Sequence, residues 1–362
     1  MNTKNKPNMR FPYGISDFRE IVSKDYFYCD RTDRIPLLED YKSILFLRPR
    51  RFGKSLLLSM LANYYDVAKA DSFEKLFGNL LIGKNPTELH NKYFILKWDF
   101  SRVDPLGGVE DIKRSLYDYI NRTIKIFKNY YKAYSIPEIE INKDNALDSI
   151  SALIGSVGNT DQSIYLLIDE YDNFANEVMM RNHSDKSNYE ALVYGDGLLK
   201  TLFKTIKSSA GESLLDRTFI TGVSPVVMSD ITSGYNIAEN IYLEPKFNDL
   251  CGLTEKEIND ALKKIEEQCG FKKGERESAL NIMQEYYNGY SFDFEGLSKI
   301  YNPTLALYFL KKFYEYCKYP DKMLDSNLAV DEAKLEYISA IPGGGQLLLG
   351  LLENDNQITI SE

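Results

Sequence analysis

The segment Gly53-Lys54-Ser55 carries the residue types that bind phosphate groups. An apolar run typical of a β-strand precedes it at residues 44–47, and a helix-forming run follows at 56–62. In this order of strand, loop and helix, main-chain N–H groups and the helix dipole attract anions. We expect Lys54 to reach the β- and γ-phosphates of a nucleotide and Ser55 to bind Mg²⁺. The predicted nucleotide-binding residues of this loop are Arg50, Arg51, Phe52, Gly53, Lys54, Ser55 and Leu56.

The loop departs from the usual phosphate-loop pattern at its first position. The pattern G-x-x-x-x-G-K-[ST] places glycine where this chain has Arg48, which is followed by Pro49. Both residues are restricted to ordinary β and proline conformations, so we expect the chain to approach the phosphate site by a different path. Taken alone, the segment also fits a basic turn before an amphipathic helix.

Two adjacent carboxylates follow a second apolar run and could support hydrolysis. Residues 163–168 have the composition of a buried strand, and Asp169 and Glu170 come directly after it. We predict that Asp169 holds Mg²⁺ through its water shell and that Glu170 orients or deprotonates the attacking water. The alternative is an ordinary strand that ends in an acidic helix cap. Asp172 is predicted to cap the next helix rather than to contact metal.

Further strand candidates alternate with helical stretches, which implies right-handed crossovers and a parallel sheet with helices on both faces. Ligands of such sheets lie beyond the carboxyl ends of the strands, where the phosphate loop and Asp169 both fall. Thr221 and Ser224 fall there too. They could sense the γ-phosphate or the water, or be ordinary strand-end hydroxyls. Strands are predicted at 93–100, 218–223 and 240–243, and helices at 109–134, 146–157 and 188–209.

The composition limits the classes of protein to consider. A chain of 362 residues suits two domains with a large core. With 44 basic and 53 acidic residues, the formal net charge of −9 argues against a dominant nucleic-acid-binding surface. No apolar run is long enough for a membrane helix or for the core of a signal peptide. We expect a soluble protein with no membrane partner.

The cysteines and histidines do not suggest a metal centre. The cysteines are scattered, with no spacing that indicates a zinc site or a disulfide framework, which favours a reducing cytoplasm. Both histidines lie in polar, loop-like surroundings, so we expect neither a histidine-based catalytic triad nor a multi-histidine metal site. The residues concerned are Cys29, Cys251, Cys269, Cys317, His90 and His183.

A domain boundary is predicted near residues 243–253, where Pro245 and Gly252 interrupt the pattern. The sequence beyond it is mainly helical and begins with a capping box formed by Thr254 and Glu257. Charged helices in this place suggest a lid that closes over the nucleotide.

Two segments near the end resemble functional motifs without the context those motifs need. Residues 342–345 are rich in glycine, but no lysine follows them, so we interpret them as a linker. Asp321, together with Glu332 and Lys334, matches the residue pattern of a nuclease active site. That chemistry needs neighbouring strands that share a metal, whereas residues 330–336 have helix-forming composition.

Several stretches together resemble the bacterial AAA-ATPase-like family, in which an arginine at position 48 is usual. They are residues 11–18, 26–32, 46–56, 167–172, 219–224, 287–292 and 301–303. The resemblance implies an α/β P-loop NTPase of the AAA+/ASCE type, with a parallel β-sheet flanked by helices and a small helical or winged-helix lid. Many members are similar to fusions with a PD-(D/E)XK nuclease-like domain, which would begin where this chain ends.

The resemblance also implies a division of the chain and a set of ligand contacts. The expected parts are an N-terminal family segment packed on the core (1–40), the ATPase core (41–247), the lid (248–340) and a linker or truncated tail (341–362). Ile15 and Phe18 are the expected contacts of the adenine. Arg217, Arg50 and Arg51 are candidates for an arginine finger if the protein forms a homo-oligomer.

The expected function is Mg²⁺-dependent binding and hydrolysis of ATP in the cytoplasm. ATP is favoured over GTP by the resemblance, and no Asn-Lys-x-Asp guanine motif follows the fourth strand. One alternative is a slow ATP-dependent switch that controls a partner protein. Another is the regulatory ATPase of a nuclease module, in which nucleic acid would be bound only through a missing C-terminal domain.

Overall fold

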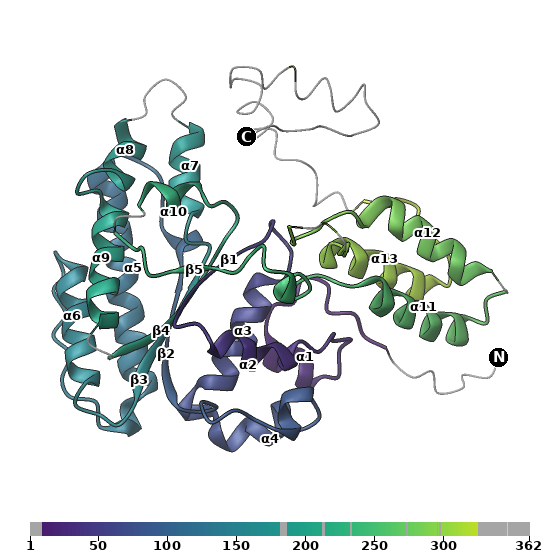
Figure 1. Cartoon of the computed structure of the whole chain (residues 1–362), viewed down its shortest axis with the longest axis horizontal. Helices are drawn as coiled ribbons and strands as arrows, with labels where there is room; N and C mark the ends of the chain where they lie inside the picture. Colours follow the sequence, from purple (N-terminus) through teal and green to yellow (C-terminus); the bar gives the residue numbers. More distant parts are fainter. Residues whose placement is uncertain are drawn as a thin grey trace.

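A computed structural model describes residues 9–181, 187–211, 214–231, 234–272, 274–294, 296, 298–324 and 346. Within these residues five strands form one sheet in the order β2-β3-β4-β1-β5, and every pair is parallel. Figure 1 shows the sheet at the centre of the larger part of the molecule. The strands are β1 (Ser43–Leu47), β2 (Tyr93–Asp99), β3 (Ser163–Asp169), β4 (Leu215–Gly222) and β5 (Glu239–Asn240). The predicted parallel α/β sheet is therefore confirmed.

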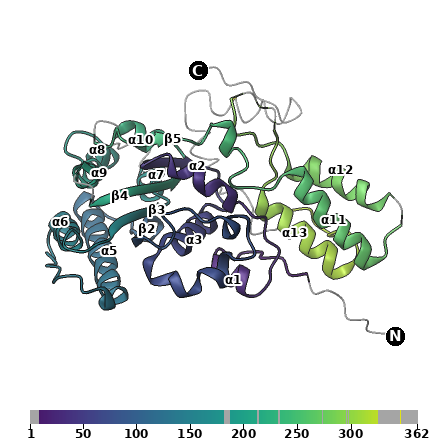
Figure 2. The same ribbon diagram turned by 60° about the horizontal axis from the view of Figure 1, so that its bottom comes forward.

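Helices cover both faces of the sheet, which explains why its central strands are apolar along their whole length. On one face α3 packs on β2 and β3, with α1 and α4 beside it. On the other face α5 packs on β2, α6 on β3 and α9 on β4. Figure 2 shows the strands between these two layers. The helices are α1 (Phe18–Ser23), α3 (Lys54–Tyr65), α4 (Phe73–Phe77), α5 (Val109–Tyr130), α6 (Ala146–Val157) and α9 (Leu198–Gly211).

Shorter helices connect these elements. The α-helices among them are α2 (Ile35–Glu39), α7 (Asn173–Arg181), α8 (Ser187–Val193) and α10 (Val226–Asp230). The 3₁₀ helices are η1 (Thr32–Arg34), η2 (Val67–Ser72), η3 (Leu81–Lys84), η4 (Phe100–Arg102), η5 (Lys132–Tyr134) and η6 (Pro245–Phe247).

The sequence predicts one helix at 188–209, but the structure has two, α8 and α9, so the prediction of a continuous helix was wrong. Gly195 has a φ of 57°, in the left-handed region that glycine adopts at little cost. At Gly197 a Cβ would lie 2.7 Å from the carbonyl oxygen of Leu192. The two glycines therefore allow the chain to turn between the helices.

The C-terminal helical domain lies to one side of the sheet, and its hydrophobic core also includes Phe11 of the N-terminal segment (Figure 1). Its helices are α11 (Glu255–Cys269), α12 (Glu275–Tyr287) and α13 (Pro303–Tyr316). The capping box that the sequence predicts is present, with the Thr254 side chain accepting from the N–H of Glu257. Isolated antiparallel bridges join Leu253 to Tyr301 and Tyr290 to Ile300.

A disulfide in this domain corrects the expectation drawn from cysteine spacing. Cys269, the last residue of α11, is bonded to Cys317, which follows α13. The two cysteines are 48 residues apart and come together only because α11 packs on α13. Cys29 and Cys251 are free thiols.

Some predictions fall outside the residues that the structure describes, namely those for His183, Glu332, Lys334 and residues 342–345. Within the described residues, no helix has the length and apolar character needed to cross a membrane.

Candidate functional site

The phosphate loop between β1 and α3 makes its turn at Arg51 rather than at its first residue. Arg51 has a φ of 67° and Gly53 a φ of 92°. No atom lies within 4 Å of the position that a Cβ of Gly53 would take, so the main chain there is open to a ligand. Because α3 begins at Lys54, the N–H groups at its head have no acceptor within the helix. The geometry suits an anion at this helix end.

Lys54 is buried at the base of the loop. Its Nζ donates to the main-chain oxygens of Arg48, at 2.8 Å, and Pro49, at 3.0 Å. Burial lowers the pKa of Lys54, and the nearby charge of Asp169 opposes this shift. The ammonium group is thus bound to neutral acceptors. Phosphate oxygens in their place would accept stronger, charge-assisted hydrogen bonds from it.

Asp169 joins the phosphate loop to two neighbouring strands. One of its carboxylate oxygens accepts from the Ser55 hydroxyl at 2.6 Å, and the other accepts from the Thr221 hydroxyl at 2.6 Å. Thr221 is fully buried, so its hydroxyl holds Asp169 and does not line an open space. The structure brings together the residues predicted for Mg²⁺, Ser55 and Asp169, although they are 114 positions apart.

Glu170 follows Asp169 in a left-handed conformation, with a φ of 49°. Such a conformation costs a non-glycine residue free energy, and it is found preferentially at functional sites. Burial raises the pKa of Glu170, and the charge of Asp169 raises it further, while Lys54 and Arg50 act in the opposite direction. A carboxylate with a raised pKa is better suited to accept a proton near neutral pH.

Tyr171 and Asp172 fix the loop that follows β4, a role that the sequence did not reveal. The Asp172 carboxylate accepts from the main-chain N–H groups of Val223 and Ser224, the latter at 2.8 Å, and from the side chain of Asn176. The Tyr171 hydroxyl donates to the Ser224 carbonyl at 2.7 Å. The prediction that Asp172 caps the next helix therefore needs correction, because its carboxylate mainly holds this loop.

Ser224 and Arg50 lie at the rim of the site. The Ser224 hydroxyl accepts from the N–H of Val226 at 3.3 Å, at the start of α10. The Arg50 guanidinium is exposed and donates to Asn173 Oδ1 at 3.0 Å. Asn173 was not singled out from the sequence, because an asparagine at the start of a helix is common.

Arg217 cannot serve as an arginine finger. It lies near the amino end of β4, whereas Thr221 lies near the carboxyl end. Its guanidinium is buried and donates to the main-chain oxygens of Glu39, at 3.0 Å, and Tyr41, at 2.8 Å. Because this guanidinium is buried and already bound within its own chain, Arg217 is not placed to reach the nucleotide of a neighbouring subunit.

A cavity of about 100 Å³ adjoins the phosphate loop and α3. The N-terminal segment contributes Pro12, Tyr28 and Arg31 to its wall, and the start of the C-terminal helical domain contributes Cys251 and Leu253. The expected adenine contacts, Ile15 and Phe18, are not among its lining residues. Phe18 is fully buried and stacks on Phe77 at 5.0 Å between ring centroids.

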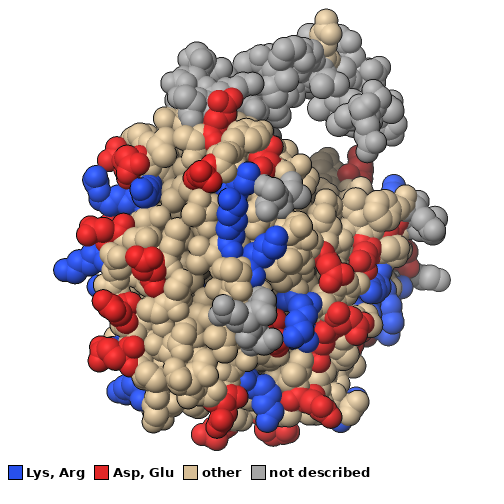
Figure 3. Space-filling model, turned by 60° about the vertical axis from the view of Figure 1, so that its left-hand side comes forward, with Lys and Arg blue, Asp and Glu red and all other residues tan. Residues whose placement is uncertain are grey.

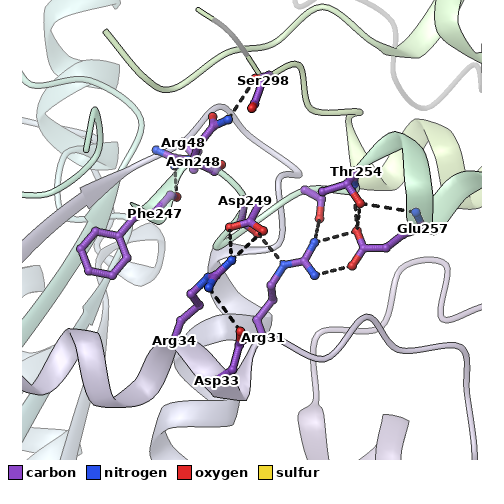
Figure 4. Close-up of polar contacts among 11 residues, drawn as sticks. Arg31, Asp33, Arg34, Arg48, Phe247, Asn248, Asp249, Thr254, Glu257 and Ser298 are labelled. Carbon is purple, nitrogen blue, oxygen red and sulfur yellow. Dashed lines mark hydrogen bonds and ion pairs between the residues drawn. The ribbon is translucent and has the colours of Figure 1, made fainter. Parts of the chain in front are cut away.

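Polar contacts tie the N-terminal segment to the C-terminal helical domain (Figure 4). Arg31 donates through both terminal nitrogens to the Glu257 carboxylate, on α11. Arg34 donates to both oxygens of Asp249, at 3.0 and 3.2 Å. Sequence reasoning missed both arginines, because no local pattern links them to acids more than 200 residues away.

Comparisons with known proteins agree with this geometry. A curated protein of Azotobacter chroococcum mcd 1, described as an uncharacterized protein in the vnfD 5' region, is 26% identical over 312 residues. The match covers 84% of this chain and 52% of that protein, so the chain spans about half the length of its relative. No solved structure matches. The model of a family described as predicted AAA-ATPase matches residues 12–232, more than half of the chain, which includes the phosphate loop, Asp169 and Thr221. The chain belongs to this AAA-ATPase-like family.

Proposed function

We propose that the protein binds ATP with Mg²⁺ and hydrolyses it. The observation that carries this proposal is the contact between the Ser55 hydroxyl and the Asp169 carboxylate at the head of α3. A hydroxyl from the phosphate loop and an acid at the carboxyl end of another strand of the sheet are the protein groups that hold Mg²⁺ in P-loop nucleotide hydrolases. Glu170 follows directly, where a water-orienting carboxylate is needed.

The residues present fit Mg²⁺ and a nucleotide. Hydroxyl and carboxylate oxygens are ligands that Mg²⁺ prefers, and this ion usually takes its other ligands from water and substrate phosphates. In keeping with that, no group of three or more His, Cys, Asp or Glu side chains forms a metal site among the described residues. Gly53 leaves space for phosphates, and the adjoining cavity gives a base a place to bind.

The proposed mechanism assigns a separate task to each side chain. Bound Mg²⁺ would supply positive charge to the phosphate oxygens as negative charge develops on them. Lys54 and the N–H groups at the head of α3 would bind the same oxygens. Thr221 would hold the Asp169 carboxylate in place through its hydrogen bond. Glu170 would orient the attacking water and take its proton.

We further propose that the C-terminal helical domain acts as a lid and that its bridge between Tyr290 and Ile300 is the wing of a winged-helix unit. Its position beside the cavity supports the first part, because Cys251 and Leu253 line that cavity. On the face drawn in Figure 3, acidic and basic side chains are interspersed. This mixture and the net charge of −9 support nucleotide rather than nucleic acid as the ligand of this chain.

The test is phosphate release from Mg-ATP by the wild-type protein and by the Glu170→Gln variant. We expect the variant to lose roughly 100- to 10,000-fold in rate while still binding ATP. Glu138→Gln is a suitable control, because the Glu138 side chain is 87% exposed and pairs only with Lys128 among the described residues. Equal rates in the wild type and the Glu170→Gln variant would refute the role of Glu170, and failure of the wild type to bind ATP would refute the proposal as a whole.

A second candidate function is a slow nucleotide-dependent switch that controls a partner. The contacts of Arg31 and Arg34 with the C-terminal helical domain favour it, since they give that domain a defined position that a nucleotide could change. Binding of ATP without measurable turnover would support the switch over the hydrolase.

A further inference from the structure

Arg48, which stands where phosphate loops usually have glycine, is a buried cation that forms no ion pair with any residue the structure describes. Its side chain is 1% exposed and lies between the rings of Phe46 and Phe292, at 4.3 and 3.9 Å from their centroids. Among the described residues no carboxylate pairs with it, and its Nε has no hydrogen-bond partner. Burial lowers the pKa of Arg48 to about 10, so it stays charged at neutral pH.

One acceptor of the Arg48 guanidinium is the Leu47 carbonyl oxygen on β1, at 2.8 Å. The other three belong to the segment that leads from the sheet to the C-terminal helical domain. Its terminal nitrogens donate to the carbonyl oxygens of Tyr242, at 2.8 Å, Phe247, at 2.7 Å, and Asn248, at 3.3 Å. Carbonyl dipoles and ring faces compensate a buried charge only in part. The closed arrangement of this segment around Arg48 therefore carries an electrostatic cost.

Phosphate in the loop would reduce that cost. Lys54 Nζ lies 2.8 Å from the carbonyl oxygen of Arg48, so the ammonium group that would bind phosphate lies against the main chain of the residue that carries the buried guanidinium. Inside the protein, opposite charges attract more strongly than in water. An anion in the loop thus stabilises the arrangement in which Arg48 is buried.

Contacts beyond Arg48 carry this effect into the C-terminal helical domain. The Asn248 side chain accepts from the N–H of Phe292 at 2.8 Å and donates to the Ser298 carbonyl at 2.9 Å (Figure 4). Phe292 covers the guanidinium and also contacts the ring of Phe52, at 5.2 Å between centroids. Phe292 and Ser298 are therefore held by the loop, by Arg48 and by Asn248 together.

We propose that Arg48 is the positioning residue through which phosphate in the loop holds residues 290–294 and Ser298, and with them the C-terminal helical domain, on the ATPase core. The inference rests on the nucleotide binding proposed above. With glycine at this position, the C-terminal helical domain would stay attached, but bound phosphate would not change the strength of its attachment. Because coupling is reciprocal, an attached domain must also raise the affinity for nucleotide.

The test is hydrogen exchange of the amides in segments 290–294 and 298–301, with and without Mg-ADP. We expect Mg-ADP to slow exchange about tenfold in the wild type and not at all in Arg48→Met, which keeps an unbranched side chain between the two rings. Arg217→Met is the matched control. It removes another buried arginine that donates to main-chain oxygens, but at the opposite end of β4. The stability of the Arg217→Met variant should fall, while Mg-ADP should still slow the exchange of the same amides.

A second variant, Asn248→Ala, keeps the phosphate loop intact and breaks the contact with Phe292. It should bind Mg-ADP but show no protection of the segment, so the role is tested even if Arg48→Met does not fold. Protection as large in Asn248→Ala and Arg48→Met as in the wild type would overturn the inference and leave the proposed function standing. Absence of Mg-ADP and Mg-ATP binding by the wild type would instead refute the proposed function.

Discussion

The ion pair between Arg31 and Glu257 should be the main electrostatic contact that attaches the C-terminal helical domain to the N-terminal segment. Arg31 Nη2 lies 2.7 Å from Glu257 Oε2, and Arg31 Nη1 bonds to the other carboxylate oxygen. Arg31 also donates to the carbonyl oxygens of Asp249 and Gly252. Glu257→Gln keeps the size of the side chain and removes its charge, so it isolates the ionic part of the contact.

The magnitude follows from how much water reaches the pair. The side chains of Arg31 and Glu257 are only 13% and 20% exposed, so the contact is stronger than a surface ion pair. Removing one partner of a hydrogen-bonded buried pair costs about 2–5 kcal/mol, and partial exposure places this pair in the lower half of that range. The Gln oxygen can still accept from the N–H of Thr254, which limits the loss at the helix cap. We therefore expect about 2–3 kcal/mol.

Hydrogen exchange of the α11 amides measures this local stability. A loss of 2–3 kcal/mol corresponds to roughly 30- to 160-fold faster exchange. The wild type, Arg31→Met, Glu257→Gln and the double variant form a double-mutant cycle, in which we expect a coupling energy of about 2 kcal/mol. Glu20→Gln is the control, because its partner Lys24 is 54% exposed and solvent screens the pair, so its loss should leave the exchange of the α11 amides unchanged.

The result that would refute this reasoning is additivity. If the effects of Arg31→Met and Glu257→Gln add to within about 0.5 kcal/mol, Arg31 acts through the main-chain oxygens alone. A second check is pH. Burial alone would raise the pKa of Glu257, but its hydrogen bond and charge contact with Arg31 outweigh burial and lower it. The attachment should therefore be complete above the ordinary carboxyl pKa and weaken as pH falls through the lowered value.

Three other predictions concern the proposed site and the C-terminal helical domain. Because burial and Asp169 raise the pKa of Glu170, kcat/KM should fall as pH drops through a value above the usual carboxyl range; a pH–rate profile with the same limb in Glu170→Gln would contradict this. Thr221→Val should lower the hydrolysis rate roughly 10- to 100-fold, because it removes a hydrogen bond of 2.6 Å to Asp169 and leaves the strand packed. Steady-state kinetics would test it, and an unchanged rate would count against the role of Thr221 in holding Asp169. Reduction of the bond between Cys269 and Cys317, or Cys317→Ser, should destabilise the C-terminal helical domain by up to about 4 kcal/mol for a separation of 48 residues. Urea unfolding with and without reductant measures this loss, and no change would show that packing alone holds α11 to α13.

The local parts of the fold could be predicted because they depend on neighbouring residues. Apolar runs of strand length, the capping box at Thr254 and the order of strand, loop and helix around Lys54 are local signals. The placement of Ser55 and Asp169 at one edge of a parallel sheet follows from the carboxyl-end rule, and the structure agrees. The sequence contains Gly195 and Gly197, but it did not predict the break between α8 and α9, because isolated glycines are often tolerated within helices.

The sequence by itself determined which residues have the chemistry proposed for binding phosphate and magnesium, because the chemistry of Lys54, Ser55, Asp169 and Glu170 belongs to their side chains and follows from their local order. Only the tertiary structure decided which polar groups meet across long separations. It buried Arg217 against the main chain of Glu39, buried Arg48 against Phe292 and paired Cys269 with Cys317. Such contacts depend on how helices and loops pack, and no spacing along the chain records that packing.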